Sequence, residues 1–166
     1  MLKKYGILLG IGLVVAVLLY PLVHELGHAL IAVIVGADVV EIKIFPIPSI
    51  LSNIKNVGNF NTALIGLGGI IFPFLLTICF RAKNFIIWYM CFTIRGISLI
   101  AFGISFMSVV LFRLGKPVVN EDLTRVLKFT PHMAPLYGTL CIFLMAVDVF
   151  LIVRSKPIQR CEEFIK

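Results

Sequence analysis

An almost uninterrupted apolar run extends from Tyr5 to Ala37 and constrains this chain more than any other feature. As one helix it would be about 48 Å long, whereas the hydrocarbon core of a bilayer is about 30 Å thick. The run therefore predicts a membrane-spanning helix that tilts, kinks or protrudes. Pro21 lacks the amide that would bond to the carbonyl of Val17, which predicts a kink one turn before residue 24.

Composition places the rest of the chain in a membrane as well. Hydrophobic residues make up 60% of the 166 residues and charged residues 14%, against averages of about 45–50% and roughly 25% in soluble proteins. The net charge of +7 comes mostly from basic residues at the ends of apolar runs, where they anchor spans to lipid headgroups. No basic stretch interleaved with aromatic residues stands clear of these runs, so we expect no nucleic-acid partner.

Four apolar runs predict a single domain, residues 1–166, with about four transmembrane helices. The expected spans are residues 5–37, 62–80, 85–112 and 133–153. The first run begins after two lysines, as a signal peptide does, but it is about twice as long as a signal core, and we expect it to be retained. The predicted fold class is an all-α, multi-pass integral membrane protein with a short β element after the first span.

That β element is predicted from the segment after the first span. Val40, Ile42 and Ile44 alternate with Glu41 and Lys43, which is the period of a strand. The following segment, residues 52–61, is expected to return as a second strand or as a loop. Two interpretations stay open: an edge on which a substrate peptide is extended, or an ordinary connecting hairpin.

The first run also contains the motif His24-Glu25-Leu26-Gly27-His28. On a helix, residues four apart share a face, so His24 and His28 present two imidazoles to one point and Glu25 projects beside them. Ionisable groups in lipid are strongly disfavoured unless a metal and one another neutralise them. The motif therefore predicts a zinc centre, with Glu25 as its general base.

A catalytic zinc generally takes three protein ligands, so one ligand is left to find among the remaining histidine and the acids. Asp122 is the first candidate, because Asn120 can cap a helix that begins there and aim the acid inward. Glu121 is the local alternative. Asp148 is the second candidate, since an acid inside a span is functional by default, although Arg95 in the third span offers it an ion-pair partner.

These features resemble the site-2 protease family of intramembrane zinc metalloproteases, in a compact form without a PDZ domain. The resemblance rests on HELGH, the strand-like residues 39–44, the glycine-rich residues 66–69 and residues 122–131. It implies that His24 and His28 bind zinc and that Glu25 is the general base. It also implies that Asp122 is the third ligand.

The sequence thus predicts an intramembrane zinc endopeptidase that hydrolyses a peptide bond within or near a transmembrane segment. Its expected partners are the lipid bilayer and a membrane-bound protein or signal-type peptide as substrate. The alternative is a non-catalytic metal-binding membrane protein, such as a metal carrier or an inactive homologue that binds membrane helices. Glu25 separates the two, because a carrier needs the histidines but no base at this position.

Overall fold

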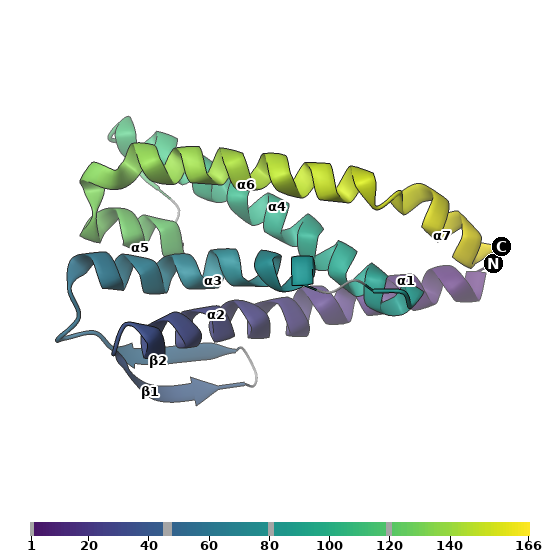
Figure 1. Cartoon of the computed structure of the whole chain (residues 1–166), viewed down its shortest axis with the longest axis horizontal. Helices are drawn as coiled ribbons and strands as arrows, with labels where there is room; N and C mark the ends of the chain where they lie inside the picture. The colour runs from purple at the N-terminus through teal and green to yellow at the C-terminus, as the bar shows by residue number, and fades with distance from the viewer. Residues whose placement is uncertain (1, 45–47, 80–81, 119–120) are drawn as a thin grey trace.

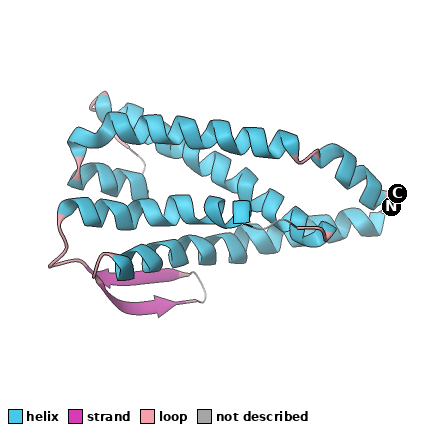
Figure 2. Ribbon diagram, viewed as in Figure 1, coloured by secondary structure: helices cyan, strands magenta, loops and turns pink. Residues whose placement is uncertain are grey.

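The computed structural model describes residues 2–44, 48–79, 82–118 and 121–166 (Figure 1). It confirms a mostly helical chain with a two-stranded antiparallel hairpin after the first long helix (Figure 2). The elements are α1 Leu2–Val14, α2 Tyr20–Ile34, β1 Asp38–Lys43, β2 Ser49–Asn53, α3 Asn59–Cys79, α4 Phe85–Arg113, α5 Asp122–Phe129, α6 Ala134–Arg154 and α7 Pro157–Ile165.

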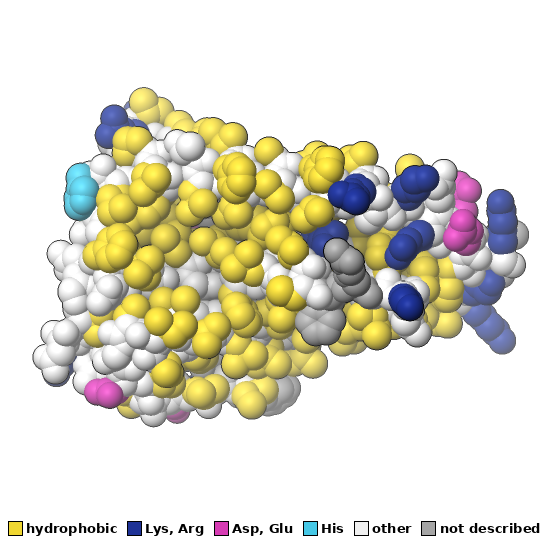
Figure 3. Space-filling model, in the orientation of Figure 1, with side chains coloured by type: hydrophobic (Ala, Val, Ile, Leu, Met, Phe, Trp, Pro, Cys, Tyr) yellow, Lys and Arg dark blue, Asp and Glu magenta, His cyan; other side chains and the backbone are white. Residues whose placement is uncertain are grey.

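Four helical stretches within the described residues are long and apolar enough to cross a membrane. They are Leu2–Ile34, Asn59–Cys79, Phe85–Arg113 and Pro131–Ile165. The first three lie close to the predicted spans, whereas the fourth extends beyond the predicted end at residue 153. Apolar side chains cover the middle of the outer surface (Figure 3), as expected for helices that face lipid rather than water.

The interruption predicted at Pro21 takes the form of a π-helical turn, Val15–Leu19, which joins α1 to α2. The amide of Tyr20 donates to the carbonyl of Val15, five residues earlier instead of four. Pro21 has no amide with which to continue the regular pattern, so the wider turn falls directly before it. The motif helix α2 thus continues the stretch Leu2–Ile34 after this wider turn.

The hairpin folds back along α2 (Figure 1). The alternating segment is confirmed as β1, and Ile42 pairs with Ile50 of β2. The returning strand occupies Ser49–Asn53, so residues 52–61 follow mainly the second of the two predicted forms, a loop, and only residues 52–53 belong to the strand. Asn59 already begins α3, so the asparagine- and glycine-bearing stretch is the connection and helix start instead of the strand.

Helix α3 packs against α2, and α4 packs against α6. The short helix α5 lies on α3 and α4 (Figure 1). It begins at Asp122, as predicted, with Glu121 at the N-cap position; the expected cap Asn120 lies outside the described residues. Buried Leu123, Val126 and Leu127 hold α5 in the core, because their spacing places them on one face.

Candidate metal centre

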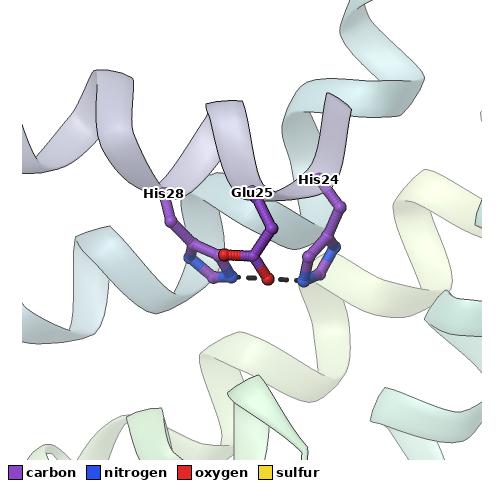
Figure 4. Close-up of side chains that lie close together, drawn as sticks. All are labelled: His24, Glu25 and His28. Atoms are coloured by element: carbon purple, nitrogen blue, oxygen red, sulfur yellow. Dashed lines mark hydrogen bonds between the residues drawn. The ribbon is translucent and has the colours of Figure 1, made fainter. Parts of the chain in front are cut away.

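His24 and His28 lie on one face of α2, with Glu25 beside them (Figure 4). Their Nε2 atoms are 3.2 Å apart. One ligand atom from each of the three side chains lies within 4.8 Å of the others. The convergence that the i, i+4 spacing predicts is therefore present. Both imidazoles remain partly accessible to solvent, with 22% of the His24 side chain and 13% of the His28 side chain exposed.

Asp122 reaches the same point from α5, 98 residues away from His24 in the sequence. Its Oδ2 atom is 2.8 Å from Nε2 of His24 and 3.3 Å from Nε2 of His28. Burial alone would raise the pKa of the Asp122 carboxyl, but hydrogen bonds to both histidines hold it well below its usual range. Asp122 is thus a carboxylate, the form that binds a cation.

The three donor atoms fit a zinc ion. Their mutual separations are 2.8, 3.2 and 3.3 Å. In a tetrahedral site with bonds of about 2.0–2.1 Å, neighbouring ligand atoms lie about 3.3 Å apart. Two imidazoles and one carboxylate also make a donor set typical of catalytic zinc, which leaves a fourth position for water or substrate.

A backbone carbonyl orients His28. Its Nδ1 atom lies 2.7 Å from the carbonyl oxygen of Ile65 in α3. Because a carbonyl can only accept, Nδ1 carries the proton and donates it, and the lone pair of Nε2 is left available to a metal ion. Sequence reasoning could not find this contact, since a backbone carbonyl has no residue signature.

Glycines bring α2 and α3 close enough for this geometry. A Cβ atom built on Gly69 would collide with the imidazole of His28, and a Cβ on Gly27 would collide with the carbonyl of Gly68. The glycine-rich start of the second span is therefore the surface that receives the motif helix.

The candidate base Glu25 is held by the hairpin. Its Oε2 atom accepts a hydrogen bond of 2.9 Å from the amide of Ile50 in β2. A cavity of about 430 Å³ opens here, lined by Glu25, His28, Asp122 and residues 49–52. The strand that borders the site is thus β2, whereas the sequence pointed to the edge near Val40.

Glu121 and Asp148 lie elsewhere. Oε2 of Glu121 accepts a hydrogen bond of 3.2 Å from Ser105 of α4, and burial raises the pKa of its carboxyl. Asp148 of α6 is fully buried, and neither of its oxygens has a hydrogen-bond partner among the described residues. The structure thus brings Asp122, the first candidate, to the histidines.

The predicted salt bridge between Arg95 and Asp148 does not form within the described residues, although the charge of Arg95 still acts on the Asp148 carboxyl group. Arg95 instead donates from Nε to Oγ1 of Thr77 at 3.1 Å and from Nη2 to the carbonyl of Thr77 at 3.0 Å. Thr77, in the last turn of α3, offers two acceptors without the cost of burying a second charge. His132 is exposed at the start of the fourth span.

Comparison with known proteins gives one family. The sequence model of peptidase family M50 matches residues 12–109, a range that includes the HELGH motif, the hairpin and the glycine-rich start of α3 but ends before α5. Searches of curated proteins and of solved structures give no match. Since the match covers more than half of the chain, including the motif that resembles the site-2 proteases, the chain belongs to peptidase family M50.

Proposed function

We propose that the protein is an intramembrane zinc endopeptidase that hydrolyses a peptide bond within or near a transmembrane segment of a membrane-bound protein or signal-type peptide. Membership of family M50 makes it a zinc metalloprotease and an integral membrane protein with four candidate spans. The observation that carries the proposal is the meeting of Asp122 with both motif histidines beside Glu25.

Each residue of the centre has a role that follows from its position. His24, His28 and Asp122 would hold the zinc through the three converging atoms. A zinc ion held there would supply Lewis-acid chemistry for the attack of water on a peptide carbonyl. Glu25 accepts the proton of the attacking water as the carbon–oxygen bond forms, and it returns that proton to the nitrogen as the carbon–nitrogen bond breaks.

Strand β2 is suited to hold the substrate in an extended form. One of its edges pairs with β1, and the amide of Ile50 points to Glu25 on the cavity side. A substrate segment that pairs with this second edge would take up the Ile50 amide and release Glu25 for proton transfer. Unwinding of the substrate helix, which hydrolysis in a bilayer requires, is thereby coupled to freeing of the base.

The test is cleavage of a single-span peptide by the purified protein in liposomes, with zinc content measured on the same samples. Glu25→Gln is expected to retain zinc and to lose about 10²–10⁴-fold in rate. Glu41→Gln is the matched control, because Glu41 is an exposed carboxylate on β1 that pairs with Lys43. Full cleavage by Glu25→Gln would reject the base assignment. Zinc-loaded wild-type protein without peptidase activity would instead favour the non-catalytic metal-binding alternative.

A further inference from the structure

The end of the molecule where both termini lie is strongly basic. Lysines and arginines gather around α7 and the start of α4, beyond the apolar middle of the surface (Figures 1 and 3). The described basic residues of this end are Lys3, Lys4, Lys83, Arg95, Arg154, Lys156, Arg160 and Lys166. Such clustering next to apolar helix ends is typical of the headgroup region of a membrane.

The position of Arg95 indicates where this basic region lies along the membrane normal. It lies in the third turn of α4, but its guanidinium bonds to Thr77 in the last turn of α3. Arg95 is therefore level with the end of a membrane span rather than with the membrane centre. The first turns of α4 project past that level, and Trp88 and Tyr89 there are residues that favour the interface.

Three cations converge on a cavity of about 360 Å³ at this level. Lys83, Arg95 and Arg160 line it together with Trp88 and Ser155. The guanidinium carbon of Arg160 lies 5.2 Å from the centre of the Trp88 ring. Within the part of the chain that the structure describes, none of the three cations forms an ion pair, and the cavity has no acidic lining residue.

Helix α7 contributes Arg160 to the lining of this cavity. It follows Lys156, whose backbone has a φ of 50° and turns the chain after α6. Nζ of Lys4 donates to the carbonyl of Phe164 at 2.8 Å, and the Phe164 ring stacks on Phe85 with centroids 4.2 Å apart. Glu163 lies in a neighbouring cavity with Lys83 and Arg160, outside the one that the three cations share.

A second cavity indicates what kind of anion belongs here. It measures about 240 Å³ and lies between the π-helical turn, α3 and α4, where Thr77 is its one polar lining residue among those described. Cys91 lines both cavities, so a basic site and an apolar site adjoin at the membrane surface. A soluble anion needs only the first, whereas a phospholipid fills the first with its phosphate and the second with the start of an acyl chain.

We infer that the basic cavity, formed by Lys83, Arg95 and Arg160, binds the phosphate headgroup of an anionic phospholipid. The lipid would hold α7 against α4 and α6. This site lies apart from the metal centre and does not depend on the proposed peptidase activity.

The experiment compares the wild-type protein with the double variant Lys83→Gln/Arg160→Gln. Lys3→Gln/Lys166→Gln is the matched control, because it removes the same charge from the same end at exposed residues that line neither cavity. Phosphatidylglycerol bound to each purified protein is measured by native mass spectrometry, and the shift of the unfolding midpoint is followed with phosphatidylglycerol, with phosphatidylcholine and with inorganic phosphate. Zinc content reports that each variant is folded.

Phosphatidylglycerol should bind the wild type and the control, and bind roughly 10- to 30-fold more weakly to the double variant. Lys83→Arg/Arg160→Lys should restore binding, because the charge returns. Equal binding by the double variant and the control would overturn the proposal. A midpoint shift of the same size with inorganic phosphate would also overturn it, since the apolar cavity would then have no part in recognition.

Discussion

Gly27 of α2 and Gly68 of α3 cross so closely that a Cβ atom on Gly68 would lie 2.6 Å from the carbonyl oxygen of Gly27, and a Cβ on Gly27 would collide with the carbonyl of Gly68. The next residue, Gly69, leaves the space that the His28 imidazole fills. Close helix contact in membranes depends on such small residues. Here the contact also sets the direction of the His28 imidazole, a proposed metal ligand, because His28 reaches the Ile65 carbonyl across the same crossing.

Gly69→Ala should therefore abolish zinc binding and cleavage, since the added methyl group displaces the His28 ring. Gly96→Ala is the matched control: a Cβ at Gly96 meets no described atom within 4 Å, and alanine is favoured over glycine in a helix by about 1 kcal/mol. Zinc per protein and cleavage rate are measured for both. Normal zinc content in Gly69→Ala would show that α3 can shift away from α2 without loss of the centre.

Asp122→Asn should weaken zinc binding by more than about 100-fold, which exceeds the loss typical of residues that only support a ligand. Glu121→Gln makes the same chemical change one residue away and should leave zinc affinity unchanged, because Glu121 is bonded to Ser105. Competition with a chromogenic chelator measures both affinities. Zinc loss in Glu121→Gln but not in Asp122→Asn would reassign the third ligand.

The sequence predicts which side chains share a face of one helix, but it predicts few of the contacts between different helices and strands. Two histidines four apart must share a face, and long apolar runs must span, so the motif and the spans follow from helix geometry. The sequence alone does not decide between Asp122, Glu121 and Asp148 as third ligand, because the approach of α5 to α2 depends on packing. Helix α7 was missed because it is short and polar on one face, with no apolar run to indicate it.

Contacts with backbone groups are a second feature that the sequence does not predict. Ile50 holds Glu25 through its amide and Ile65 orients His28 through its carbonyl, and any residue could provide either group. The salt bridge predicted between Arg95 and Asp148 does not form for a related reason. Complementary charges suggest a contact, but the Arg95 guanidinium is satisfied by the hydroxyl and carbonyl of Thr77.

Asp148→Asn should raise the free energy of unfolding by about 1 kcal/mol, because a buried amide costs less than a buried carboxylate without partners. Zinc content should not change. Unfolding of Asp148→Asn, Arg95→Gln and the double variant is measured as a double-mutant cycle. The expected coupling is smaller than that of a direct salt bridge, since Arg95 donates its hydrogen bonds to Thr77 and acts on Asp148 only through its charge. A large favourable coupling, with Asp148→Asn less stable than the wild type, would support a direct ion pair between Arg95 and Asp148.

Removal of zinc should destabilise the protein unevenly. The three proposed ligands come from α2 and α5, so a bound zinc ion would tie α5 to the motif helix. A ligand that binds only the folded state stabilises it by about 4 kcal/mol at 1,000 times its dissociation constant. A chelator should lower the unfolding midpoint of the wild type and increase amide hydrogen exchange in residues 122–129, while α7 keeps its exchange rate.

Two variants make this result specific to the centre. Glu25→Gln should respond to the chelator as the wild type does, because Glu25 is the proposed base and not one of the three proposed ligands. His28→Ala should start at the lower midpoint and show no further change. An equal chelator effect on His28→Ala would mean that the stabilising metal binds elsewhere. Increased exchange in both α5 and α7 would mean that zinc stabilises the whole bundle rather than the junction between Asp122 and the two histidines.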